Sequence, residues 1–224
     1  MDFKLASVDS LIIYFGNEIS ADISSKVKNA YLSLQKLNCE GIIEIIPSYS
    51  SIFITYDIFK YDYEKVVELL KNSITTKSNE SNDEKVVNID VYYGVEVGLD
   101  LEDMSTKTDL SIQEIIDIHS NKLYDVYAIG FLPGFAYLAS VDQRIAMPRL
   151  SSPRKQIPKG SVSIADTQTA VYPQASPGGW NIIGRTALEL FDKNLDSLSP
   201  LSVGNKVKFN SISKEEFLSQ GGIL

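Results

Sequence analysis

The chain has 224 residues, of which 44% are hydrophobic, and it carries a formal net charge of −8 at pH 7. This apolar fraction is ample for one large or two small domains. The acidic balance argues against nucleic-acid binding, because such proteins need a basic face to displace counterions from phosphate. The single cysteine, Cys39, cannot form an internal disulfide, and no signal peptide or membrane-spanning run is visible. We therefore expect a cytoplasmic protein without membrane contact.

Residues 1–75 have the pattern of a small α+β domain. Apolar residues recur at helical spacing in two stretches, and two β-prone runs flank the turn that begins at Pro47. The expected elements are strands at 11–15, 42–46 and 52–56 and helices at 21–37 and from Tyr63 to Leu70. Two ββα halves of this kind predict a ferredoxin-like α/β sandwich, one sheet covered by two helices.

The next stretch is polar. Between Ser73 and Lys85 only Ile74 is apolar, and such a segment cannot bury enough surface to order itself. We therefore place a linker at residues 76–85, between a first domain at 1–75 and a second at 86–224. The alternative is a long hairpin loop inside a single domain.

The second domain begins with strand character at Ile89–Tyr93. Asp100 is positioned to cap a short helix from Leu101 to about Lys107, and the capping box Ser111-Ile-Gln-Glu114 opens a helix to about His119. Ser213 caps a last short helix. The remaining expected strands are 126–130, 161–164, 170–172, 181–184 and 206–210. Many short strands separated by Gly and Pro predict a barrel or a sandwich.

The segment from Gly130 to Thr186 combines turns with ligand-binding side chains. Its strings are Gly130-Phe-Leu-Pro-Gly-Phe-Ala-Tyr137, Met147-Pro-Arg-Leu-Ser-Ser-Pro-Arg154, Ile157-Pro-Lys-Gly-Ser161, Thr167-Gln-Thr-Ala-Val-Tyr-Pro173, Ser176-Pro-Gly-Gly-Trp180 and Gly184-Arg-Thr186. From Tyr124 to Thr186 six basic residues stand against three acidic ones, so this region carries +3 and the remainder −11. A small anionic ligand in a site built from loops would explain the pattern. A β-rich core with ordinary turns is the alternative.

Several common types of catalytic or binding site are excluded by the sequence. Lys159-Gly160-Ser161 has the residue types in the wrong order for a phosphate-binding loop, and no Gly-x-Ser-x-Gly nucleophile elbow is present. One histidine and one cysteine cannot supply a typical zinc site, so no metal site is expected. The chain on its own does not have the residues of a complete enzyme of a standard type.

These strings, in this order and spacing, resemble the family of the bacterial 5-oxoprolinase B subunit, allophanate hydrolase subunit 1 and the kinase inhibitor KipI. Further matching strings lie in the segments 48–56, 93–101, 118–120 and 203–209, so the resemblance covers nearly the whole chain. It implies a cyclophilin-like β-barrel for the second domain. It also implies an ATP-dependent hydrolase that cleaves 5-oxo-L-proline to L-glutamate. ATP would bind together with partner chains, a homologous C subunit and a LamB/YcsF-like A subunit.

Five residues are candidates for catalysis. Arg149, Arg154 and Arg185 would bind carboxylate or phosphate through their planar forks, unless they are merely solvated. His119, the only histidine, would serve either as a partner of the helix dipole or in proton transfer. Gln168 would supply a neutral hydrogen-bonding group. The family pattern Gly-x-Gln-Thr-Gly departs here to Asp166-Thr-Gln-Thr-Ala170.

Ten further residues are candidates for contacting substrate or a partner. They are Phe131, Pro133, Gly134, Tyr137, Lys159, Tyr172, Ser176, Gly178, Gly179 and Trp180. Trp180 would be either a core residue or one wall of a ligand pocket. The apolar loop around Phe131 would be either core or a docking surface.

Two other functions share these motifs. A KipI-like protein would bind a sensor histidine kinase and block its autophosphorylation, with the apolar loop as its working surface. A component of an allophanate hydrolase or carboxyltransferase would act on urea-derived substrates. The residues quoted do not separate these functions from a role in 5-oxoprolinase.

Overall fold

The computed structural model describes residues 1–18, 20–76 and 85–224. The chain divides into two compact units, Met1–Asp83 and Glu84–Leu224. Most of the expected linker at 76–85 lies outside the described residues, so its role stays a prediction. Among the helices that the structure describes, none is long and apolar enough to cross a membrane.

The first unit is one antiparallel sheet with two helices. Its elements are β1 (Asp2–Ser7), β2 (Ser10–Tyr14), α1 (Ala21–Gln35), β3 (Ile42–Pro47), β4 (Ser51–Tyr56) and α2 (Tyr63–Ser73). The side chains of Ser20 and Asp62 cap α1 and α2, as short polar side chains do for the free amides of a first turn. Alternate residues of β2 and β4, such as Leu11, Ile13 and Ile54, are buried against the apolar faces of both helices.

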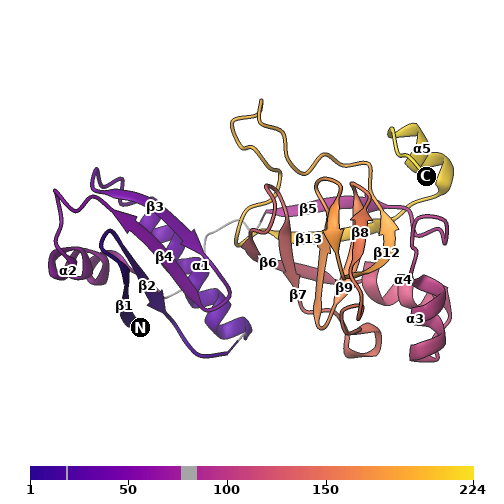
Figure 1. Cartoon of the computed structure of the whole chain (residues 1–224), viewed down its shortest axis with the longest axis horizontal. Helices are drawn as coiled ribbons and strands as arrows, with labels where there is room; N and C mark the ends of the chain where they lie inside the picture. Colours follow the sequence, from indigo (N-terminus) through magenta and orange to yellow (C-terminus); the bar gives the residue numbers. More distant parts are fainter. Residues whose placement is uncertain (19, 77–84) are drawn as a thin grey trace. The chain divides into compact units, whose positions relative to one another are not determined.

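The strand order β1-β2-β4-β3 explains why the unit is ferredoxin-like. Reading from β2, the chain runs through strand, helix, hairpin and helix, and β1 fills the edge that the last strand of a ferredoxin-like chain would occupy (Figure 1). The sequence patterns did not predict β1. Five of its six residues are exposed, so it lacks the alternation that marks a half-buried strand.

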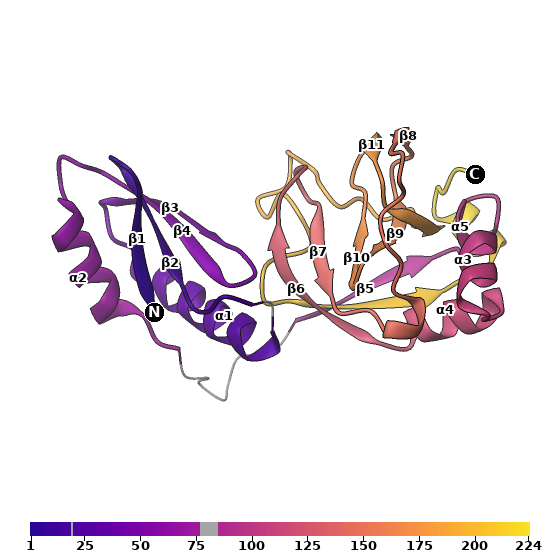
Figure 2. The ribbon, with the colours of Figure 1, turned by 60° about the horizontal axis from the view of Figure 1, so that its bottom comes forward.

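The second unit is built on a seven-stranded sheet. Its strands are β5 (Val86–Val91), β6 (Leu123–Ile129), β7 (Ala136–Ala139), β9 (Ser161–Ala165), β10 (Gln168–Val171), β12 (Asn181–Arg185) and β13 (Lys206–Ser211), in the order β12-β9-β10-β7-β6-β13-β5. The two edges meet through Tyr92 and Arg185, whose backbones exchange hydrogen bonds of 2.9 and 2.8 Å. The sheet is therefore nearly closed, and the expected α+β class with a barrel-like second domain is confirmed (Figure 2).

Helices and a two-stranded sheet complete this unit. Helices α3 (Leu101–Thr108) and α4 (Ile112–Ser120) lie against each other, and α4 packs on β13 (Figure 2). A short helix η1 (Gln143–Ile145) precedes β8 (Arg154–Ile157), which pairs with β11 (Ser176–Gly178) in a separate two-stranded antiparallel sheet. Helix α5 (Lys214–Ser219) carries Phe217, whose ring stacks on the ring of Tyr92. Strands β7, β8 and β11 were not predicted, and β7 occupies part of what we interpreted as an apolar loop.

Candidate functional site

An aromatic pocket lies beside the two-stranded sheet of β8 and β11. Its volume is about 310 Å³, and its walls are Phe131, Phe135, Tyr137, Arg149, Pro153, Tyr172, Pro177, Gly178, Gly179 and Trp180. Seven of these residues belong to the predicted set, namely Phe131, Tyr137, Arg149, Tyr172, Gly178, Gly179 and Trp180. The Gly- and Pro-rich strings, which lie far apart in the sequence, therefore meet at one concave site.

Phe135 is the centre of the aromatic wall. Its ring lies edge-on to Phe131, Tyr137, Tyr172 and Trp180, with ring centroids 4.9–5.7 Å apart. Such edge-to-face pairs stabilise aromatic clusters beyond their buried area. Phe135 is 1% exposed and Trp180 is 4% exposed. Trp180 is therefore a core residue, and its ring also forms part of the pocket wall.

Phe131 forms the rim. It is 61% exposed and has φ +70°, a left-handed conformation that is strained for a bulky residue. Within the same loop, Gly134 has φ +81°, and a Cβ there would approach the Leu190 carbonyl oxygen to 2.3 Å. This glycine is therefore required by the turn, and Pro133 beside it is exposed. Backbone strain of this kind concentrates at functional sites.

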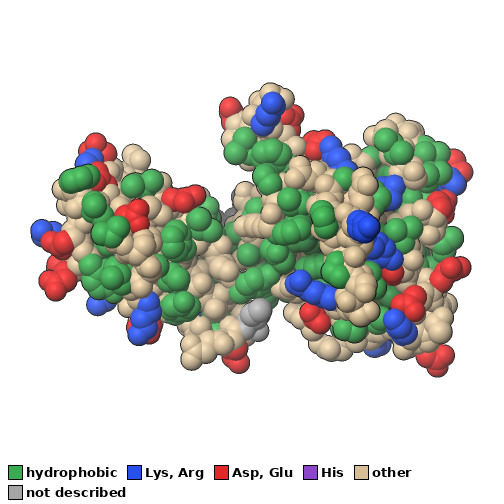
Figure 3. Space-filling view, in the orientation of Figure 1, with side chains coloured by type: hydrophobic (Ala, Val, Ile, Leu, Met, Phe, Trp, Pro, Cys, Tyr) green, Lys and Arg blue, Asp and Glu red, His purple; other side chains and the backbone are tan. Residues whose placement is uncertain are grey.

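Arg149 supplies the positive charge of the pocket. Its guanidinium carbon lies 5.6 Å from the centre of the Trp180 ring, a cation–π geometry. Among the described residues no acidic side chain pairs with it, and it is exposed. Figure 3 shows Lys and Arg side chains on the face of this unit over β8 and β9. The guanidinium of Arg149 is thus available for an anionic ligand.

The hydroxyl of Tyr172 can form hydrogen bonds in the pocket but does not act as a base. Burial raises its pKa to about 12, while the charge of Arg149 acts in the opposite direction. Its hydroxyl stays protonated near neutral pH and can donate. It also sets the shape of the wall, since a Cβ on Gly178 would lie 2.3 Å from the Tyr172 hydroxyl oxygen.

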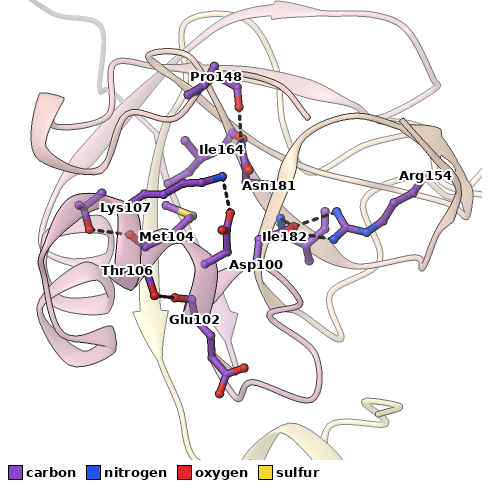
Figure 4. Close-up of polar contacts among 12 residues, drawn as sticks. Asp100, Glu102, Met104, Thr106, Lys107, Pro148, Arg154, Ile164, Asn181 and Ile182 are labelled. Carbon is purple, nitrogen blue, oxygen red and sulfur yellow. Dashed lines mark hydrogen bonds and ion pairs between the residues drawn. The ribbon is translucent and has the colours of Figure 1, made fainter. Parts of the chain in front are cut away.

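Arg154 does not face the pocket, contrary to our expectation. Its Nη1 and Nη2 donate to the two carboxylate oxygens of Asp100 at 2.9 and 2.7 Å (Figure 4). Asp100 is 5% exposed and also accepts the Ile182 amide at 2.6 Å. Asp100 is the N-cap residue of α3, as expected, but its side chain makes no capping hydrogen bond because it is used by Arg154 and the Ile182 amide. Burial of this carboxylate requires a cation, which explains why the Arg154 guanidinium is committed to Asp100 although its side chain is 28% exposed.

Arg185 also lies elsewhere. It is 8% exposed at the seam of the barrel, and its Nη1 donates to the Ile223 carbonyl at 2.9 Å. Burial lowers the pKa of this guanidinium. Of the three candidate arginines, only Arg149 lines this pocket.

His119 is a core residue. It is fully buried between the rings of Tyr124 and Phe209, and its two ring nitrogens lie 2.8 Å from the Tyr93 hydroxyl and 2.9 Å from the Thr169 hydroxyl. Burial lowers its pKa to about 3. A neutral, fully hydrogen-bonded histidine in this position neither neutralises a helix dipole nor reaches the pocket.

Three other candidates lie away from the pocket lining. Lys159 pairs with Glu189 on the surface, Gln168 begins β10 in a half-buried position, and Ser176 begins β11 with its hydroxyl directed to the Pro177 carbonyl. Asp166, which replaces a family glycine, has φ +51°, and Asp tolerates this conformation better than most residues. Among the described residues no cluster of His, Cys, Asp and Glu could hold a metal ion.

Sequence reasoning did not single out Asp100 or Asn181 for the site. Asn181 is 1% exposed and donates to the carbonyls of Pro148 and Ile164. Only its place directly after Trp180 marked it in the sequence.

Comparison with known proteins identifies the family. Residues 1–201 match the family described as carboxyltransferase domain, subdomain C and D. The chain is 38% identical over 219 residues to the B subunit of 5-oxoprolinase from Bacillus subtilis, covering 93% of this chain and 91% of that protein. It is 36% identical over 170 residues to the protein of the same name from Haemophilus influenzae, covering 76% and 79%.

A solved structure agrees with these sequence matches. The crystal structure of TTHA0988 superimposes with a TM-score of 0.83 at 29% identity and covers 91% of this chain. This chain spans 40% of the length of that longer one. The chain therefore belongs to the family of the 5-oxoprolinase B subunit, whose members carry the carboxyltransferase C and D subdomains.

Proposed function

We propose that this chain is the B subunit of an ATP-dependent 5-oxoprolinase, which opens the lactam of 5-oxo-L-proline to give L-glutamate. The observation that carries the proposal is the 38% identity with the Bacillus subtilis protein over 93% of the chain. The pocket around Arg149 is the part of the chain that we assign to the substrate.

The shape and charge of the pocket suit this substrate. 5-Oxoproline is a small ring that carries one carboxylate, and a volume of about 310 Å³ is at the small end of ligand pockets. The aromatic walls would pack against the ring, and the fork of Arg149 would bind the carboxylate bidentately. The protonated hydroxyl of Tyr172 would donate a hydrogen bond to the lactam.

The pocket binds but does not carry out hydrolysis. None of the ten residues that line it has a side chain that acts as a base or nucleophile near neutral pH. Opening the lactam breaks the bond between the carbonyl carbon and nitrogen, places the water oxygen on that carbon and leaves the proton on the amine. The groups that activate water and the carbonyl would therefore come from the partners, a homologous C subunit and a LamB/YcsF-like A subunit.

The Lys159-Gly160-Ser161 string does not have the geometry of a phosphate-binding loop. In Lys159-Gly160-Ser161, the Gly160 amide donates to the Tyr172 carbonyl at 2.8 Å and the Ser161 amide to the Pro158 carbonyl at 3.3 Å. A phosphate-binding loop needs such amides free, and Lys159 is paired with Glu189. We therefore place ATP on one of the partner chains.

Reconstitution tests the proposal. The purified chain alone should release no glutamate from 5-oxoproline, and mixing it with the A and C subunits from the same organism should give ATP-dependent release. Omitting any one component should abolish turnover. Turnover by the isolated chain would contradict the shared reaction, and an inactive complete mixture would contradict the proposed function.

One observation favours a regulatory rival. Phe131 has an exposed ring on a strained backbone. If the chain is a KipI-like inhibitor, this ring is placed where it could dock on a histidine kinase. In that case the chain should inhibit kinase autophosphorylation, and replacing Phe131 with Ala should remove the inhibition. The same three-component mixture would then remain without oxoprolinase activity.

A further inference from the structure

The backbone around Arg149 is fixed on both sides by residues 179–181, which contain Trp180 and lead into β12. On one side Asn181 Nδ2 donates to the Pro148 carbonyl at 2.9 Å (Figure 4). On the other side the Leu150 amide donates to the Gly179 carbonyl at 2.7 Å. The Arg149 peptide thus lies between two hydrogen bonds, although its own side chain is exposed.

Asn181 joins this segment to the barrel. The same Nδ2 also donates to the carbonyl of Ile164, its cross-strand partner on β9, at 3.1 Å. A primary amide nitrogen has two N–H bonds, so one side chain serves both carbonyls. A hydroxyl has a single proton and could serve only one. Asn181 therefore adds a link between the Arg149 segment and β9, one residue before Arg149, beside the hydrogen bond of 2.6 Å from the Asp166 amide to the Met147 carbonyl.

Trp180 and Asn181 act on the same arginine from adjacent positions. Trp180 directly precedes β12 and lines the pocket, whereas the side chain of Asn181, the first residue of β12, points to the Pro148 carbonyl. The ring then supports the guanidinium and the amide holds the backbone. A shift of the backbone would move the guanidinium off the ring, because nothing else among the described residues pairs with it.

We infer that Asn181 is a positioning residue, which sets the affinity of the pocket for a carboxylate by holding Arg149 over Trp180. The ligand part of this inference rests on the proposed function, whereas the geometric part concerns the free protein alone. Asn181 itself does not line the pocket, so its effect must pass through Arg149.

A double-mutant cycle tests this coupling. Asn181→Ser replaces the two N–H donors by one O–H on a shorter side chain, so at least one of the two hydrogen bonds is lost. The effect on the dissociation constant of 5-oxoproline is measured in the wild-type background and in an Arg149→Ala background. We expect about a tenfold weaker affinity in the first case and less than a twofold change in the second, because coupled residues are not additive. Equal factors in both backgrounds would overturn the inference, since a general loss of stability acts in both.

A spectroscopic readout separates this inference from the proposed function. Trp180 is the only tryptophan, so its emission reports the guanidinium above it without any ligand. Asn181→Ser should reproduce the spectral change caused by Arg149→Ala and add nothing in that background. An unchanged spectrum would refute the positioning role. If 5-oxoproline does not bind the wild-type chain while the spectral coupling holds, only the proposed function fails.

The matched control is Asn210→Ser. Asn210 Nδ2 donates to Asp90 at 3.0 Å between β13 and β5, away from the pocket lining. This variant loses a comparable amide hydrogen bond and should leave both the Trp180 spectrum and the ligand affinity unchanged. Asn181→Thr provides a second test if the serine variant does not fold, because its methyl group retains more of the side-chain volume.

Discussion

The pocket and the barrel core both combine aromatic rings with a basic side chain, and they use it in opposite ways. In the pocket, Arg149 lies over Trp180, is exposed and has no acidic partner in the described part of the chain. In the core, His119 is surrounded by rings, fully buried and bonded at both nitrogens. The difference shows that access and pairing, rather than residue type, decide between binding and structural support.

The arginines follow the same rule. Arg154 is paired bidentately with a buried carboxylate, and Arg185 is buried at the barrel seam. A charge that already has its partner stabilises the fold and is not available to a ligand. Changes in the core should therefore act on stability, and changes in the pocket on binding.

The largest effect is expected at the buried ion pair. Arg154→Ala would leave the Asp100 carboxylate buried without a cation, and we expect the free energy of unfolding to fall by about 3 kcal/mol. Urea denaturation measures this loss. Arg154→Ala combined with Asp100→Asn should recover part of it, whereas Arg144→Ala, at an exposed pair with Asp142, should barely change the midpoint. If Arg154→Ala and Arg144→Ala lowered the unfolding midpoint equally, the contrast between the buried and the exposed ion pair would be contradicted.

The second effect is the pH dependence of stability. The folded pKa of His119, about 3, lies below its ordinary value of 6.5, so the unfolded state binds more protons in between. Stability should therefore fall by about 1.4 kcal/mol per pH unit as the pH drops below 6.5, or about 2 kcal/mol by pH 5. His119 is the only histidine, and His119→Gln should flatten the dependence over this interval. A wild-type stability that stays constant from pH 6.5 to 5 would contradict the assignment.

The third effect is on activity. Arg149→Ala should lower the rate of the assembled complex at least tenfold, equivalent to about 1.4 kcal/mol, because the substrate carboxylate loses its only cation in the pocket lining. The unfolding midpoint should hardly move, since this side chain is exposed. Arg149→Lys should retain part of the activity. A strongly lowered midpoint would place Arg149 with the structural arginines instead.

The smallest effect concerns the strained rim. Phe131→Gly and Phe131→Ala remove the same ring, but only glycine relaxes the backbone at φ +70°. We expect the glycine variant to be more stable than the alanine variant by about 0.5–1 kcal/mol, with 5-oxoproline binding weakened equally in both. Calorimetry and binding titrations measure the two quantities. Equal stability of the variants would show that the backbone at this position is not strained.

The sequence alone was sufficient for features that depend on near neighbours. The capping boxes of Ser111 with Glu114 and of Ser213 with Glu216 are both formed, because all their atoms lie within one helical turn. Helical periodicity placed α1 and α2, and Gly- and Pro-rich strings marked the turns that build the pocket. Strands β1, β8 and β11 were missed, since exposed or very short strands have no distinct pattern.

What only the tertiary structure decided was the partner of each charged or titratable side chain. Asp100 lies 54 residues from Arg154 in the chain, and Thr169 lies 50 residues from His119, so no local pattern relates them. The sequence indicated which residue types were available for a site. Barrel closure then buried His119 and Arg185, joined Arg154 to Asp100, and left Arg149 open over Trp180, because long-range packing determines which side chains lose contact with water and which remain accessible to a ligand.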